Sequence, residues 1–127
     1  MIEDYAMSLA KKHFEADGYT IEVIGKPYDL HCRKAQKTLY VEVKGTQTEG
    51  EDILLTPNEV LFAEGHRDQM ALFVVRDICI VGTGGHRRAE GGVIEVRMHW
   101  QPDRKRLTPI CYSYRLGEKA MRAKTSI

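Results

Sequence analysis

Two carboxylates and one ammonium group in the first half of the chain stand at positions that suit phosphate chemistry. Asp29 follows a Gly-Lys-Pro-Tyr segment, and Glu42 and Lys44 flank a single valine. Because residues i and i+2 of a strand lie on one face, Glu42 and Lys44 should project together if this segment is a strand. Carboxylate oxygens are typical ligands of hard divalent cations, and a neighbouring ammonium group offsets charge on a phosphate. The trio therefore indicates a site for a divalent cation and a phosphate.

A β-hairpin is the element expected to bring the trio together. Residues 39–44 alternate between apolar and polar side chains, as a half-buried strand does. One face would hold Leu39, Val41 and Val43, and the other Tyr40, Glu42 and Lys44. Residues 33–37 are polar and turn-like, so a strand beginning at residues 28–30 is expected to pair with residues 39–44. Asp29 would then lie beside Glu42 and Lys44 on one sheet face.

Apolar spacing and capping signals predict two helices around this hairpin. Apolar side chains recur at helical spacing over residues 2–16, and Gly18 is a suitable stop. Thr56 suits an N-cap, Pro57 suits the first helical position, and Glu59 can complete a capping box. A second helix is therefore expected over residues 57–64, ending near Gly65.

The remaining segments predict further strands. These are residues 19–24, with Ile21 and Val23 facing inward, the continuous apolar run 70–75, and residues 78–81, 93–100 and 110–116. Arg76-Asp77 is typical of a tight turn, residues 82–92 hold five glycines and predict a mobile loop, and residues from Gly117 onward are expected to fray or form a short helix. The order predicts an α/β fold, α-β-β-β-α-β, with a mixed β-sheet flanked by helices and extra C-terminal strands.

Length and composition favour a single domain spanning residues 1–127. Hydrophobic residues make up 43% of the chain and charged residues 29%, as in ordinary globular proteins. The three cysteines include no CxxC pair, which argues against a disulfide framework or a zinc site and favours a reducing cytoplasm. No apolar run has the length of a membrane span, and the N-terminus lacks the apolar core of a secretion signal, so no membrane partner is expected.

Charge is divided unevenly along the chain. Residues 1–64 carry 7 Lys and Arg against 12 Asp and Glu, whereas residues 65–127 carry 12 against 6. The basic second half could bind a polyanion while the acidic first half holds a cation. A chance distribution of charge over a solvated surface is an equal alternative. The residues that could contact a phosphate backbone are Arg87, Arg88, Arg104, Lys105 and Arg106, and plain solvated loops are an equal alternative.

The motif segments resemble the PD-(D/E)xK nuclease superfamily, which has the restriction-endonuclease-like fold. Pro27-Tyr28-Asp29 is similar to the first half of its motif and Glu42-Val43-Lys44 to the second. A tyrosine separates the proline from the aspartate, a variation common in the group. With Leu55-Thr56-Pro57-Asn58-Glu59 added, the chain most resembles the Mrr-like, nuclease-like No Vein C-terminal domain. The resemblance covers about residues 1–75, and the last fifty or so residues carry none of it.

The resemblance implies a role for each matching residue. Asp29 and Glu42 would bind one or two Mg²⁺ ions, with Mn²⁺ as a substitute, and the backbone carbonyl of Val43 would be a further ligand. Lys44 would orient or help to deprotonate the attacking water and offset charge on the scissile phosphate. Glu3, on the first helix, is the candidate for an accessory carboxylate.

The function expected from these residues is a Mg²⁺-dependent endonuclease acting on DNA, with RNA as an alternative substrate. A homodimer or a partner protein would supply specificity, and a role in restriction, repair or defence follows by family analogy. The alternative is a non-catalytic module that keeps the fold and binds nucleic acid or protein.

Overall fold

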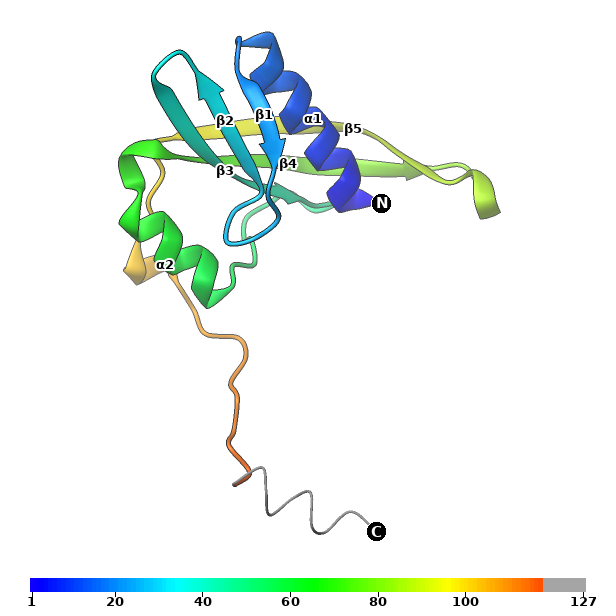
Figure 1. Ribbon diagram of the computed structural model, residues 1–127. Coiled ribbons are helices and arrows are strands. Elements are labelled where there is room, and N and C mark those ends of the chain that lie inside the picture. Colours follow the sequence, from blue (N-terminus) through cyan, green and yellow to red (C-terminus); the bar gives the residue numbers. More distant parts are fainter. Residues whose placement is uncertain (118–127) are drawn as a thin grey trace, which may run out of the picture.

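The computed structural model describes residues 1–117, which contain a five-stranded mixed sheet, with helix α1 across it and helix α2 near one end (Figure 1). The elements in order are α1 (Ile2–Ala16), β1 (Thr20–Val23), β2 (Leu30–Lys34), β3 (Lys37–Gly45), α2 (Pro57–Gly65), β4 (Met70–Val81) and β5 (Arg88–Met98). Single 3₁₀ turns occupy Arg67–Gln69, Gly84–His86 and Arg104–Arg106. The predicted α/β class and the order α-β-β-β-α-β are confirmed.

The sheet runs in chain order from β1 to β5. β3 and β4 are parallel, and every other neighbouring pair is antiparallel. The chain passes from β3 to β4 through α2, the kind of crossover that parallel neighbours require. β3 is the central strand of the five, and it carries two of the predicted site residues.

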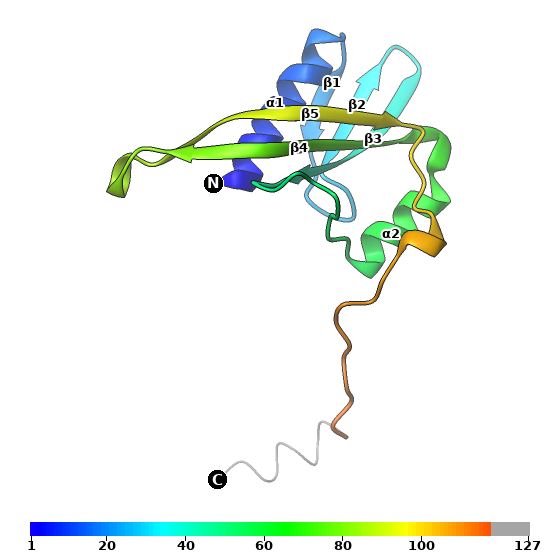
Figure 2. The same ribbon diagram turned by 180° about the vertical axis from the view of Figure 1, so that it is seen from behind.

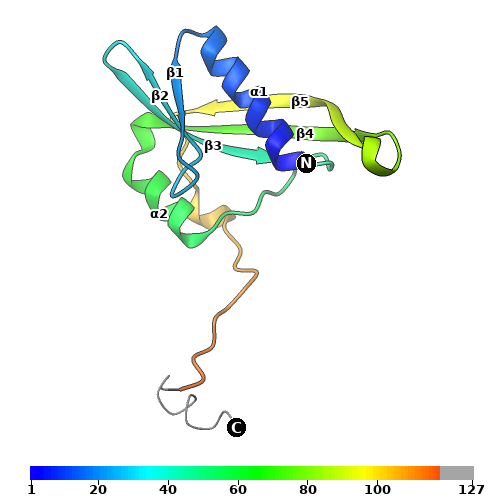
Figure 3. The ribbon, with the colours of Figure 1, turned by 45° about the vertical axis from the view of Figure 1, so that its right-hand side comes forward.

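Helix α1 supplies the larger core. Its small residues Ala6 and Ala10 and the ring of Phe14 follow helical spacing and are buried. They pack against the inner face of the sheet, formed by side chains that include Leu39, Val41, Ala71, Phe73 and Val75. Figure 3 shows α1 lying across this face of the sheet. The bounds predicted for this helix are confirmed.

Helix α2 lies against the opposite side of β3 from α1. Its start is the predicted capping box: Thr56 Oγ1 accepts from the Glu59 N–H at 3.2 Å, and Glu59 Oε1 accepts from the Thr56 N–H at 2.9 Å. Phe62 then packs edge-on against Tyr40 of β3, with ring centroids 5.2 Å apart. The capping box thus begins α2 directly over the polar face of β3.

The hairpin of β2 and β3 is confirmed, but its turn is tighter than the polar stretch predicted. Lys34 and Lys37 are paired, so the turn consists of Ala35 and Gln36, and Ala35 has a φ of 54°. Polar residues such as Arg33 lie on exposed strand positions, which made the turn look longer. Asp29 lies in the bend that precedes β2 and is not part of the strand.

The second half of the sheet differs from the prediction at Arg76-Asp77. No turn breaks the chain there, because β4 continues through Val81 as one strand. Asp77 takes a φ of 55°, which aspartate tolerates better than most residues, and Arg76 is held by Glu95 at 2.9 Å. The charged pair therefore marks a local distortion within one long strand.

The glycine-rich segment is strand over residues 88–92, whereas residues 82–87 form the connection that was predicted as a loop. β5 begins at Arg88, and Gly91 pairs with Ile78. A Cβ at Gly92 would lie 2.9 Å from Val75 Cγ1, so this glycine permits close strand packing. The long β4–β5 hairpin projects past α1 (Figure 1, Figure 3).

Two other strand predictions are wrong. Val23, expected to face inward, is 53% exposed because β1 is an edge strand, whereas Ile21 does pack against the core. Residues 110–116 form no strand and are exposed, since alternation alone supplies no neighbouring strand to pair with. Gly117 lies in a bend, and the terminal helix or fraying expected after it lies outside the described residues. Over residues 1–117, no helix is long and apolar enough to cross a membrane.

Candidate active site

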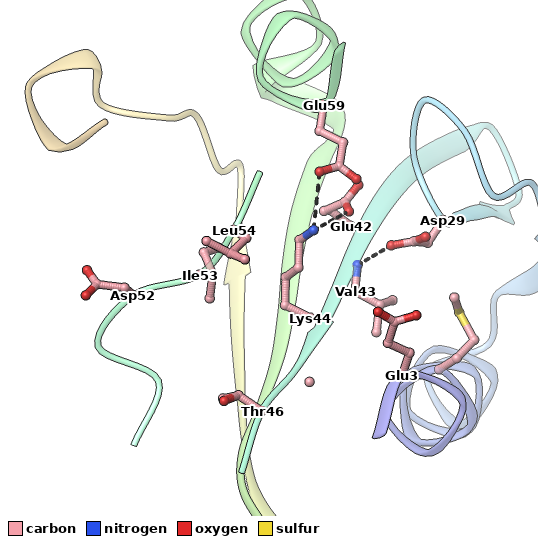
Figure 4. A pocket seen from close by; sticks show the side chains of 12 residues that line it. Glu3, Asp29, Glu42, Val43, Lys44, Thr46, Asp52, Ile53, Leu54 and Glu59 are labelled. Atoms are coloured by element: carbon pink, nitrogen blue, oxygen red, sulfur yellow. Dashed lines mark hydrogen bonds and ion pairs between the residues drawn. The ribbon is translucent and has the colours of Figure 1, made fainter. Parts of the chain in front are cut away.

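The predicted trio meets at one cavity of about 410 Å³, between α1, β3 and the start of α2 (Figure 4). Asp29, Glu42 and Lys44 all line it, and Glu3 lines it from the first turn of α1. The other lining residues are Met7, Val43, Gly45, Thr46, Asp52, Ile53, Leu54 and Glu59. The structure thus brings together every carboxylate and the lysine that the sequence had suggested for the site.

Asp29 is fixed to β3 by its backbone and its side chain. Its N–H donates to the Val41 carbonyl at 3.0 Å, and its Oδ2 accepts from the Val43 N–H at 2.7 Å. Burial raises the pKa of Asp29 above its ordinary value, although the hydrogen bond from Val43 and the nearby Lys44 act in the opposite direction. The bend before β2 therefore holds a carboxylate at the end of the hairpin.

Glu42 is the most buried of the site residues, with 2% of its surface exposed. Burial, the charge of Asp29 and a hydrogen bond with Glu59 together raise the pKa of Glu42 to about 9, despite the opposing effect of Lys44. The fold therefore holds this carboxyl group in a place with more negative than positive charge. A cation of higher charge would relieve that imbalance.

Lys44 lies between two carboxylates. Its Nζ is 3.3 Å from Glu42 Oε1 and 3.2 Å from Glu59 Oε1. Both contacts are visible in Figure 4, where the ammonium group points away from the sheet toward α2. As predicted, Glu42 and Lys44 share one face of β3.

Glu59 is a site residue that the sequence analysis missed. Its place in the capping box accounted for it as part of the helix start, so no role in the site was predicted. Burial raises its pKa, but hydrogen bonds from Thr56, Glu42 and Lys44 outweigh that effect and lower the pKa below the ordinary value. The capping box was itself the available signal: it places Glu59 in the first turn of a helix that follows the Glu42–Lys44 strand.

The available donors suit Mg²⁺ in kind. Asp29 and Glu42 offer carboxylate oxygens, and the Val43 carbonyl points to the same side of β3 as its N–H, toward Asp29. Mg²⁺ prefers such oxygen ligands and keeps several waters. Over residues 1–117, no three or more His, Cys, Asp or Glu side chains are grouped so as to hold a metal. Asp29, Glu42 and Val43 are thus the residues with suitable oxygen donors on this side of the cavity.

The basic residues lie in two separate places. Arg87 and Arg88 are at the tip of the β4–β5 hairpin, whereas Arg104, Lys105 and Arg106 form a 3₁₀ turn beside α2 (Figure 2). Arg104 forms a double hydrogen bond with Glu64 at 2.7 and 2.6 Å, and Arg88 lies 3.5 Å from Glu90. Lys105 and Arg106 are exposed, and Arg106 lines a second cavity of about 290 Å³. The five residues form no single patch.

Comparison with known proteins gives one match. The family described as "Protein NO VEIN, C-terminal" matches residues 2–86, which include Asp29, Glu42, Lys44 and Glu59. Neither a curated protein nor a solved structure matches the chain. The matched segment ends within the β4–β5 hairpin, so it contains all the residues that line the first cavity.

Proposed function

The chain belongs to the NO VEIN C-terminal family, and from the geometry of its cavity we propose that it is a metal-dependent nuclease that hydrolyses phosphodiester bonds in DNA. One observation carries the proposal: Lys44 Nζ lies 3.3 Å from the buried Glu42, in a cavity that Asp29 also lines. A pair of carboxylates with an adjacent ammonium group suits phosphodiester hydrolysis. The resemblance to PD-(D/E)xK nucleases supports the same reading.

In this proposal each side chain has a distinct task. Asp29, Glu42 and the Val43 carbonyl hold Mg²⁺, which when bound supplies an activated water and neutralises phosphate charge. Lys44 donates hydrogen bonds to the charge that develops on the scissile phosphate and helps to orient the attacking water. The hydrogen bond from Val43 keeps Asp29 aimed at the cavity. Glu3 is an accessory carboxylate at the cavity wall.

Substrate and setting are part of the same proposal. Exposed Arg87, Lys105 and Arg106 are available to contact a phosphate backbone outside the cavity. A second copy of the chain or a partner protein would place two such sites on a duplex. Cys32, Cys79 and Cys111 are free thiols, which suits a reducing compartment such as the cytoplasm.

Nicking of supercoiled plasmid DNA in Mg²⁺ or Mn²⁺ tests the proposal. Wild-type protein is compared with Glu42→Gln and Lys44→Met, and with Glu15→Gln as a matched control at an exposed position of α1. We expect the two site variants to lose about 100-fold or more of the nicking rate, and the control to keep it. Chelation by EDTA should abolish the wild-type reaction.

Equal nicking by the wild type and both site variants would contradict the proposal, because the activity would then come from elsewhere. No nicking by any of them, together with retained DNA binding, would favour the non-catalytic binding module. A labelled RNA substrate in the same assay decides whether DNA or RNA is cut faster.

A further inference from the structure

One oxygen atom joins the start of α2 to the lysine of the candidate site. Glu59 Oε1 accepts a hydrogen bond from the Thr56 N–H at 2.9 Å and another from Lys44 Nζ at 3.2 Å. Figure 4 shows Glu59 reaching from α2 toward Lys44 across the top of the cavity. The helix cap and the ion pair therefore share one acceptor.

The cap alone does not require a negative charge at this position. A capping box forms with Gln as well as with Glu, because the side chain only has to accept the N-cap N–H. The same holds for Thr56 Oγ1, which accepts from the Glu59 backbone whatever side chain stands at residue 59. The carboxylate charge is thus available for a second task, and Lys44 is the cation that it contacts.

We propose that Glu59 is a positioning residue for Lys44, holding the ammonium group at a point fixed by the start of α2. This inference rests on the proposed nuclease function. The capping hydrogen bond from the Thr56 N–H holds the Glu59 carboxylate itself, and its donor is a backbone group that a change of the Thr56 side chain does not remove. Lys44, a flexible side chain, gains a fixed direction from an acceptor that cannot easily move.

The position of Lys44 matters because Glu42 competes for it. Lys44 Nζ is 3.3 Å from Glu42 and 3.2 Å from Glu59, so the ammonium group is shared between them. Without the charge of Glu59, Lys44 would pair with Glu42 alone and compete with the cation for that carboxylate. Glu59 therefore keeps Lys44 beside the cation site and available to the phosphate.

Glu59→Gln is the informative variant, because it keeps the cap acceptor and removes the charge. We expect kcat for plasmid nicking to fall about 10- to 100-fold and the Mg²⁺ concentration for half-maximal rate to rise. KM for DNA should stay unchanged, since Glu59 acts through Lys44. Thr56→Ala is the matched control: it removes the other half of the cap, leaves the backbone N–H that binds Glu59, and should lower Tm with kcat kept within about threefold.

The outcomes separate this inference from the proposed function. If the wild type nicks DNA and Glu59→Gln is equally active, the positioning role is overturned but the proposed nuclease function is not. Parallel losses of kcat and Tm in Glu59→Gln and Thr56→Ala would reduce Glu59 to a helix cap and also overturn it. A wild type without metal-dependent nicking would refute the nuclease, and the role of Glu59 with it.

Discussion

Asp29 and Val43 are joined by a 2.7 Å hydrogen bond from the backbone N–H of Val43 to Oδ2 of Asp29. The bond lies just before β2 begins, where β3 extends beyond the hairpin, since Leu30 and Val41 are the pair at this end of the two strands. The Asp29 side chain thus accepts the hydrogen bond that a backbone carbonyl of a longer β2 would accept from β3. The same contact satisfies the strand and orients a carboxylate of the candidate site.

The first prediction separates these two roles of Asp29. Asp29→Asn keeps an oxygen that can accept from Val43, so its free energy of unfolding should stay within about 0.5 kcal/mol of wild type, whereas Asp29→Ala should lose about 1–2 kcal/mol. Both variants should bind Mn²⁺ more weakly. Urea denaturation and calorimetric titration measure the two effects. Equal destabilisation by Asn and Ala would mean that the hydrogen bond is not what stabilises this bend.

The second prediction concerns pH in metal-free protein. The pKa of Glu42 is raised from an ordinary 4.5 to about 9, so between these values the folded state holds a proton that the unfolded chain has released. Stability should therefore be highest at low pH within this range and fall as the pH rises toward 9, by up to about 1.4 kcal/mol per pH unit. Burial raises the pKa of Asp29 in the same direction. Urea denaturation in EDTA at pH 6, 7, 8 and 9 measures the slope.

Glu42→Gln is the control for this slope, because an amide has no proton to lose in this range. We expect the variant to be more stable than metal-free wild type at pH 8.5 and to show a flatter pH dependence. Added Mg²⁺ should stabilise the wild type more at pH 8.5 than at pH 6, since a cation binds the ionised carboxylates. An unchanged slope in Glu42→Gln would assign the pH dependence to other groups.

The parts of the fold that were predicted correctly rest on local signals. The spacing of Ala6, Ala10 and Phe14 defines α1, and the capping box at Thr56 and Glu59 defines the start of α2. Both patterns depend only on residues within one or two helical turns of each other, so they can be recognised from the sequence alone. The alternation along β3 placed Glu42 and Lys44 on one face for the same reason.

The parts that were missed depend on residues far apart in the chain. Glu59 joins the site through Lys44, fifteen positions away, and a cap signal does not reveal that contact. Asp77 looked like a turn residue, but β4 pairs with β5 on both sides of it, and Glu95 of β5 binds the neighbouring Arg76. Residues 110–116 alternate like a strand and have no partner strand. Strands need neighbours, and periodicity alone does not provide them.

The third prediction uses the three cysteines as probes of burial. Cys32 is fully buried in β2, and burial raises its pKa to about 12, whereas Cys79 and Cys111 are exposed. At pH 8 two thiols should react rapidly with a disulfide reagent, and the third only after denaturation. Cys32→Ser should remove the slow thiol and leave the fast ones. Three thiols of equal reactivity in the native protein would contradict the burial of β2.

The fourth prediction tests how closely α1 must approach the end of β3. A Cβ at Gly45 would lie 2.8 Å from Ala6 Cβ and 3.2 Å from the Ile2 carbonyl oxygen, so Gly45→Ala should push the start of α1 away and cost about 1–3 kcal/mol of unfolding free energy. Gly65→Ala is the control, since no atom lies within 4 Å of its added Cβ. That helical position should tolerate alanine or gain stability. Urea denaturation compares the two variants. Nicking should fall with Gly45→Ala alone, because Gly45 adjoins Lys44 and α1 carries Glu3. Equal stability of the two variants would show that α1 can move without cost.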